Sequence, residues 1–141
     1  MIEWVIEDQL ARGRRPGYRG ESGGPVSRSE VDGWLEAVRA RGVASIICLL
    51  AEDQLSFYAS LPASLPEYYR DAGLEVAHIP ARDLQSPPLT EQQLNEVWRA
   101  YQRLPKPVLV HCSAGVDRSG AAVRHIQERL NESRSSDRTH A

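Results

Sequence analysis

The residues with the clearest chemical potential are a cysteine and an arginine in the segment HCSAGVDRSG, residues 111–120. Cys112 and Arg118 are separated by five residues, and a chain this rich in arginine would contain such a pair by chance roughly one time in five. The histidine before the cysteine, the glycine three residues after it and the Ser-Gly after the arginine lower that chance to on the order of 10⁻⁶. The segment therefore indicates a reactive site.

The chemistry that these residue types support is nucleophilic attack on a phosphate group. A turn between a strand and a helix directs successive backbone N–H groups inward, where the helix dipole also favours an anion. Gly115 permits the tight turn, and the planar guanidinium of Arg118 can bind two phosphate oxygens. The same donors should keep Cys112 as a thiolate near neutral pH, and a thiolate is a nucleophile. The residues predicted to bind phosphate are Ser113, Ala114, Gly115, Val116, Asp117 and Arg118.

Short apolar runs predict the strands that must position this loop. Residues 43–50 (VASIICLL) and 74–80 (LEVAHIP) are typical of buried strands, and residues 108–110 predict a third strand that leads directly into the loop. Residues 4–10 have weaker strand character. They precede a Gly- and Arg-rich stretch, residues 10–25, that we interpret as a loop.

Capping signals predict the helices. An S-x-x-E box at Ser27 and a T-x-x-Q box at Thr90 indicate the starts of two amphipathic helices. The first should end near Gly42 and the second before Pro105, and apolar residues on one side of 121–130 predict a third helix after the loop. Strands that alternate with helices predict an α/β fold, with a mostly parallel central sheet flanked by helices.

Length and composition predict one globular domain. The chain has 141 residues and a net charge of −2, so no overall field attracts nucleic acid or an anionic membrane. We expect a single domain over residues 1–131 and a disordered tail over residues 132–141, which contain no large apolar side chain. The longest uncharged apolar run, residues 43–51, is about half of what a membrane-spanning helix needs. The N-terminus has no signal-peptide core, so we expect a cytoplasmic protein.

The segment VLVHCSAGVDRSG resembles the signature loop of the protein tyrosine phosphatase superfamily, in its dual-specificity branch. The resemblance extends over roughly residues 4–130, although the loop is its specific part. It implies the dual-specificity type of α/β architecture, a reaction through a cysteinyl-phosphate intermediate, and no cofactor or metal. The H-C-x-x-G-x-x-R-S spacing and the late position of the loop argue against the related sulfur-transfer and arsenate-reducing loops.

The resemblance also implies a role for each catalytic residue. Cys112 would attack phosphorus, and Arg118 would bind the substrate and stabilise the equatorial charge. Asp83 would protonate the leaving oxygen and then activate water. Ser119 would ease departure of the thiolate, and His111 would orient the loop by hydrogen bonding without transferring protons.

Other acidic residues compete with Asp83 for the role of general acid. Asp83 follows a predicted strand and lies on a proline-flanked loop that could close over a substrate. An aspartate before proline residues is also a common turn former, and Asp71 and Asp53 are rival acids.

Two loop residues bear on the substrate. Relatives that prefer inositol phospholipids often carry lysine where this loop has Val116, and Asp117 adds negative charge beside the arginine. Asp117 has an alternative interpretation as an acid that stabilises the helix start. We expect a phosphorylated protein as substrate, with phosphotyrosine and also phosphoserine or phosphothreonine as targets. The alternatives are a phosphoinositide, an RNA 5′ phosphate, or a module that binds phosphate without turnover; the sequence leaves the oligomeric state open.

Further residues have a functional and a plain interpretation. Arg14, Arg15 and Arg19 could line the mouth of the site, although exposed arginines on loops are usually only solvated. Cys48 is most simply a core residue, and its sharper interpretation is a redox partner that forms a reversible disulfide with Cys112. His78, on a strand flank, is interpreted as a structural residue, and His140 lies in the predicted tail.

Overall fold

In the part of the chain that the computed structural model describes, residues 2–20 and 23–139, five strands form one sheet in the order β1-β2-β5-β3-β4. The strands are β1 (Ile2–Ile6), β2 (Leu10–Gly13), β3 (Ser45–Cys48), β4 (Glu75–His78) and β5 (Val108–His111). β1 pairs with β2 in the antiparallel direction, and the other neighbouring pairs are parallel. The predicted α/β fold with a mostly parallel sheet is therefore confirmed.

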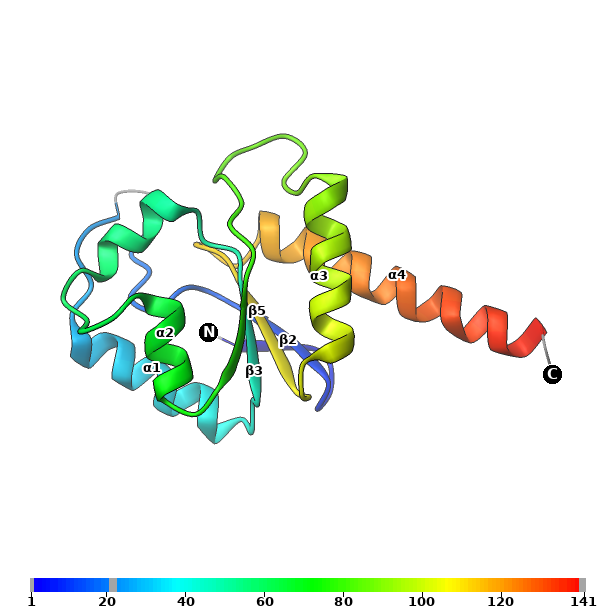
Figure 1. Ribbon diagram of the computed structural model, residues 1–141, viewed down its shortest axis with the longest axis horizontal. Coiled ribbons are helices and arrows are strands. Elements are labelled where there is room, and N and C mark those ends of the chain that lie inside the picture. The colour runs from blue at the N-terminus through cyan, green and yellow to red at the C-terminus, as the bar shows by residue number, and fades with distance from the viewer. Residues whose placement is uncertain (1, 21–22, 140–141) are drawn as a thin grey trace.

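Helices cover both faces of this sheet. They are α1 (Arg28–Ala40), the 3-10 helix η1 (Glu52–Tyr58), α2 (Leu65–Asp71), α3 (Glu91–Arg103) and α4 (Asp117–Thr139). Figure 1 shows α1 and α2 on one side of the sheet and α3 on the other, while α4 starts beside α3 and extends away from the body. Each face has its own core, because successive strand residues alternate in direction: Ile47 and Val110 pack toward α3 and α4, and Ile46 and Leu109 toward α1 and α2.

The capping signals locate two helices correctly. The Ser27 hydroxyl accepts a hydrogen bond from Glu30 N, and the Glu30 side chain accepts one from Ser27 N, so the predicted capping box starts α1. Thr90 and Gln93 form the same reciprocal pair at the start of α3. Each box satisfies backbone N–H groups that a helix start leaves free.

The prediction of a loop over residues 10–25 is wrong at its start. Residues 10–13 form β2, an inner strand between β1 and β5, after a turn in which Asp8 adopts a φ of 61°. Leu10 and Ala11 are fully buried, while Arg12 is paired with Glu3 on β1. Four residues that include arginine and glycine have little strand propensity, so this strand depends on its two long-range partners.

The prediction of a disordered tail is also corrected. Helix α4 continues through Thr139, and only residues 140 and 141 of the predicted tail lie outside the described residues. Residues 131–134 are exposed. A backbone without large apolar side chains can stay helical without burial. No helix in the described residues is long and apolar enough to cross a bilayer.

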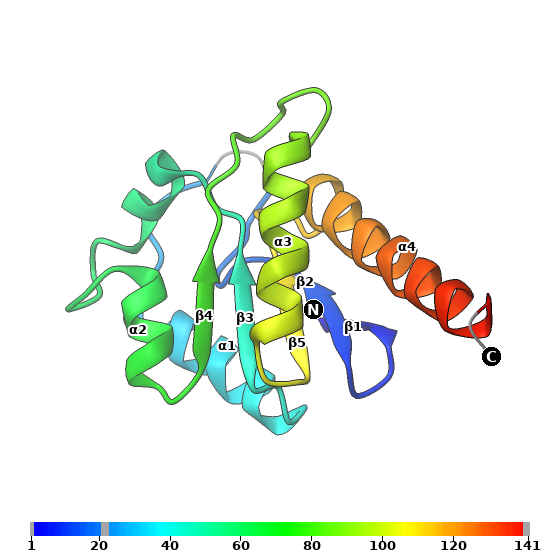
Figure 2. The same ribbon diagram turned by 45° about the vertical axis from the view of Figure 1, so that its right-hand side comes forward.

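The parallel strands place four connecting segments at one edge of the sheet. Gly13 and Cys48 both lie in register with His111, and Cys48 with His78, so the carboxyl ends of β2, β5, β3 and β4 are level. In Figure 2 the segments that follow β3 and β4 rise at the upper end of the sheet. Open α/β sheets bind ligands at this edge.

Candidate active site

The loop between β5 and α4 is held against the end of β2. Gly115 has a φ of +78°, and a Cβ atom there would lie 2.5 Å from the carbonyl oxygen of Gly13. The backbone N–H of Arg15 donates to the carbonyl oxygen of Ser113 at 3.0 Å. The position of Gly115 thus requires glycine for both its conformation and its close contact with β2.

Arg118, in the first turn of α4, is anchored by one edge of its guanidinium. The side chain is 2% exposed, and its Nη1 donates to the carbonyl oxygens of Leu49 (3.3 Å) and Ala81 (2.8 Å) and to Oε1 of Gln54 (2.9 Å). Its Nη2 lies 3.3 Å from Oδ1 of Asp83, yet it is buried and makes no hydrogen bond with a described residue. A buried donor in this state is costly unless a ligand occupies it.

Asp83 is held beside Arg118 on the segment that follows β4. One carboxylate oxygen accepts the backbone N–H of Leu84 at 3.0 Å, and the other faces Nε2 of Gln54 at 3.4 Å. The side chain is 51% exposed, so it is fixed on one side and accessible on the other. This arrangement suits a group that exchanges a proton with a bound molecule.

Asp83 and Gln54 border a cleft of about 500 Å³ at the carboxyl edge of the sheet, and the buried Arg118 contacts both of them. Its lining comes from the segments that follow all four parallel strands. The lining side chains include Arg15, Tyr18, Asp53, Gln54, Phe57, Asp83, Leu84, Ser113, Ala114 and Asp117. Two of the three acids considered from the sequence, Asp83 and Asp53, therefore lie at the cleft, and Asp83 alone of the three forms an ion pair with Arg118.

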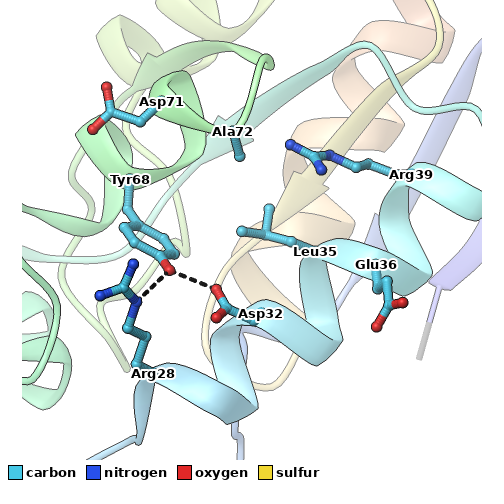
Figure 3. A pocket seen from close by; sticks show the side chains of 8 residues that line it. All are labelled: Arg28, Asp32, Leu35, Glu36, Arg39, Tyr68, Asp71 and Ala72. Atoms are coloured by element: carbon cyan, nitrogen blue, oxygen red, sulfur yellow. Dashed lines mark hydrogen bonds between the residues drawn. The ribbon is translucent and has the colours of Figure 1, made fainter.

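The third acid, Asp71, lies elsewhere. It borders a separate groove of about 440 Å³ between α1 and α2 (Figure 3). The Tyr68 hydroxyl in that groove donates to Asp32 at 2.5 Å and accepts from Nε of Arg28 at 3.0 Å. This position removes Asp71 as a candidate for the general acid.

Comparison with known protein families shows to which family the chain belongs. Residues 23–128, most of its length, match the family described as "Polymorphic toxin system, DSP-PTPase phosphatase". The chain belongs to this DSP-PTPase family. The matched segment contains Asp83, Cys112 and Arg118, and it excludes β1, β2 and Arg15.

Several solved structures share the fold of this DSP-PTPase. Tk-PTP in its active form is 27% identical, with a TM-score of 0.58, and the match covers 86% of this chain and 67% of that one. A putative phosphatase (DUF442) from Shewanella putrefaciens CN-32 is 17% identical, with a TM-score of 0.66 over 93% of this chain and 72% of that one. The core catalytic domain of the PP-IP phosphatase SIW14 from S. cerevisiae, in complex with citrate, is 16% identical, with a TM-score of 0.55 over 92% and 66%. The chain thus spans about two thirds of the length of several of these structures, and no curated protein matches it.

His111 of the DSP-PTPase is a neutral residue that fixes the backbone of Cys112. Its Nδ1 lies 3.0 Å from the Cys112 carbonyl oxygen, and its Nε2 lies 3.0 Å from the hydroxyl of Tyr69. A carbonyl oxygen only accepts, so Nδ1 carries the proton and the Tyr69 hydroxyl donates to Nε2. Burial lowers the pKa of His111 to about 4 and raises the pKa of Tyr69 well above its usual value. Trp34 packs against both rings, with centroid distances of 5.4 Å.

Ser119, in the first turn of α4, is fully buried and has no hydrogen-bond partner for its hydroxyl among the described residues. Cys112 is 2% exposed. The Ser119 hydroxyl is therefore free to donate to a group that forms in the loop during a reaction.

Cys48 and Cys112 pack on different faces of the sheet. Cys48 lies in the core toward α1 and α2, and Cys112 in the core toward α3 and α4. Both are free, and burial raises the pKa of Cys48 to about 12. A disulfide between them would need a side chain to change face, and the redox pairing stays a prediction.

Arg15 is the member of the arginine group that joins the site. It is 2% exposed, its Nε donates to the Ser113 hydroxyl at 3.0 Å, and its guanidinium packs over the ring of Phe57 at 4.7 Å. Arg14 and Arg19 are exposed. The sequence did not separate the three, because Arg15 is positioned by β2, and β2 itself was missed.

Gln54 was not predicted as a site residue. Its Oε1 accepts from Nη1 of Arg118 and from the backbone N–H of Ala51, while its Nε2 points to Asp83. The amide therefore links the buried guanidinium to the carboxylate. Nothing in the local sequence around a glutamine in the first turn of η1 indicates that it links these two groups. Among the described residues, no group of three or more His, Cys, Asp or Glu is arranged to hold a metal ion.

Proposed function

We propose that this DSP-PTPase hydrolyses phosphate monoesters through a cysteinyl phosphate on Cys112, and that its substrates are phosphotyrosine proteins. The observation that carries the proposal is the state of Arg118. One terminal guanidinium nitrogen, Nη1, donates to three acceptors, while the other, Nη2, is buried beside the candidate acid and makes no hydrogen bond with a described residue. A phosphate oxygen is the acceptor that this nitrogen lacks.

In the first half of the reaction, Sγ of Cys112 attacks phosphorus. The bond between phosphorus and the leaving oxygen breaks, and Asp83, which takes up a proton from solvent once the phosphate has displaced it from Arg118, gives that proton to the leaving oxygen. Arg118 and the backbone N–H groups of Ser113 to Asp117 stabilise the charge on the equatorial oxygens. A phosphate on Arg118 also displaces the Asp83 carboxylate from the guanidinium, which frees Asp83 to face the leaving group.

In the second half, Asp83 takes a proton from water and the water oxygen attacks phosphorus. The bond between sulfur and phosphorus breaks, and Cys112 leaves as a thiolate. The unpartnered hydroxyl of Ser119 stabilises that thiolate. His111 stays neutral throughout, because its imidazole only orients the Cys112 carbonyl.

The loop composition favours protein substrates over polyanionic ones. Val116 stands where lipid-directed relatives often carry lysine, and the exposed Asp117 lines the cleft. Phosphoserine and phosphothreonine are the secondary targets of this proposal. A thiolate nucleophile requires a reduced cysteine, so we place the enzyme in a reducing compartment such as the cytoplasm.

The test is hydrolysis of para-nitrophenyl phosphate between pH 5 and 8, with reductant and with a chelator. We expect chelator-resistant turnover that falls at least about 10³-fold in Cys112→Ser, because the hydroxyl is a far weaker nucleophile. Cys48→Ser is the matched control and should keep most of the activity, since that thiol is outside the reaction.

Equal activity in the wild type and Cys112→Ser would place the chemistry elsewhere and refute the proposal. A single burst of product followed by stalling would instead favour a phosphate-binding module that does not turn over. Faster hydrolysis of an inositol phosphate or an RNA 5′ phosphate than of phosphotyrosine peptides would overturn the substrate assignment alone.

A further inference from the structure

The mouth of the cleft carries a large, exposed hydrophobic side chain. Leu84, 87% exposed, lines the cleft beside Asp83. Val116, the other large exposed hydrophobic among the described residues at 61%, lines a separate pocket beside β1 and β2. Single exposed apolar residues are common on protein surfaces, but Leu84 lies where a substrate must approach the candidate acid. Its location indicates contact with a substrate larger than a phosphate ester.

Leu84 is presented to solvent by an unusual backbone. Its φ is 61°, in the left-handed region that leucine rarely adopts, and its N–H is held by the Asp83 carboxylate at 3.0 Å. The same bond that fixes the candidate acid therefore points the leucine outward. Strained backbone of this kind concentrates at functional sites.

The charged residues that line the cleft provide a second observation, separate from the exposed Leu84. Asp53, Asp83 and Asp117 line the cleft, and the carboxylates of Asp53 and Asp117 form no ion pair with the described residues. The cation among the lining residues, Arg15, is 2% exposed and packed between aromatic rings. The buried Arg118, which contacts Asp83 and Gln54 of the lining, provides positive charge for one phosphate. A single phosphate is thus attracted to Arg118, while further negative charge meets the carboxylates that line the cleft.

We propose that this cleft selects phosphorylated protein segments with a basic residue and an apolar residue beside the phosphorylated one. The inference rests on the proposed function and deepens it. The basic residue pairs with Asp53 and Asp117, and the apolar residue packs on Leu84. Substrates with a second phosphate or acidic neighbours are disfavoured, because their charge faces the same carboxylates.

The experiment compares phosphotyrosine peptides of equal length with Arg and Leu, Arg and Ser, or Glu and Ser beside the phosphotyrosine. Binding to Cys112→Ser is measured by calorimetry, and kcat/KM is measured with the wild type. We expect the Arg-Leu peptide to exceed the Glu-Ser peptide by about tenfold in both measurements. Asp53→Asn should reduce the preference for Arg over Glu by about two- to fivefold. Leu84→Asn, which suits the left-handed backbone, should remove the preference for Leu over Ser.

The controls separate recognition from chemistry. Asp71→Asn, in the groove between α1 and α2, should change neither preference. Hydrolysis of para-nitrophenyl phosphate should stay within about twofold in Asp53→Asn and Leu84→Asn, because that substrate is too small to reach these side chains. Equal binding of all three peptides to Cys112→Ser, or no binding of any, overturns the inference. If the wild type does not hydrolyse para-nitrophenyl phosphate, that result would instead contradict the proposed function.

Discussion

The imidazole beside the candidate nucleophile is neutral in the folded protein and would be largely protonated in the unfolded chain at pH 5. His111 is fully buried, and its pKa is lowered to about 4, mainly by burial. Its hydrogen bonds to the Cys112 carbonyl and the Tyr69 hydroxyl use both ring nitrogens in the neutral form. The residue that orders the loop therefore also makes the fold sensitive to acid.

This residue gives the stability a pH dependence of known sign. As the pH falls from 7 to 5, the unfolded state binds a proton on this histidine and the folded state does not, so the free energy of unfolding decreases. The decrease from this residue should be about 2 kcal/mol. Urea unfolding at pH 7 and pH 5 measures it, in the wild type and in His111→Asn, which keeps a donor for the carbonyl but does not titrate. A pH dependence that is unchanged in His111→Asn would show that another group causes it. The control variant is His78→Gln, which removes a half-buried histidine and should keep the decrease in the free energy of unfolding.

At the scale of elements, the loop and β2 form one unit. Gly115 contacts the backbone of Gly13, and Arg15 is bonded to Ser113 through both its backbone and its side chain. The contact leaves no room for a side chain at position 115. The loop of the candidate site is thus shaped as much by the strand beside it as by its own sequence.

Two glycine substitutions should differ in what they change: one should lower activity and the other should raise stability. Gly115→Ala places a methyl group 2.5 Å from the Gly13 carbonyl oxygen at a positive φ, so para-nitrophenyl phosphate hydrolysis should fall at least about 10²-fold. Gly33→Ala, in the middle of α1, should raise the free energy of unfolding by about 0.5–1 kcal/mol, because outside the adjacent backbone of α1 no heavy atom lies within 4 Å of the new methyl group. Chemical unfolding and the hydrolysis assay check both. An active Gly115→Ala variant would mean that the loop does not need this contact.

These elements also mark what the sequence could predict. The boxes at Ser27 and Thr90 located α1 and α3, because capping is a contact within four residues. Cys112 and Arg118 were found for the same reason, as one short segment contains them. By contrast, β2 depends on pairing with β1 and β5, and Gln54 acquires its role from Arg118, 64 residues away. Local sequence does not record such distant contacts.

At the scale of the whole molecule, α4 divides into a packed part and an exposed part. Ile126 is fully buried and Leu130 packs against the core, whereas residues 131–134 are exposed, in the part of the helix that leaves the body in Figure 1. The packed part contains Arg118 and Ser119, so it belongs to the site. The end of the helix has no described contact with the core that would stabilise the domain.

Removal of residues 132–141 should therefore leave the domain intact. We expect the melting temperature to change by less than about 2 °C and the rate of para-nitrophenyl phosphate hydrolysis to stay within about twofold. Thermal unfolding and the hydrolysis assay of the shortened chain test this. A drop of roughly 5 °C or more would mean that the end of α4 contributes to stability.

The way in which the four parallel strands share the site has a consequence for how the protein acquires its activity. The contacts that build the cleft join residues far apart in the chain: Arg15 to Ser113 across 98 positions, and Arg118 to Gln54 and Ala81 across 64 and 37. No short segment of the chain contains the whole cleft, because the residues that line it follow four different strands. Non-local pairings of this kind form slowly and late. Recovery of catalysis during refolding should thus lag behind recovery of helical signal, and activity reports the completion of folding.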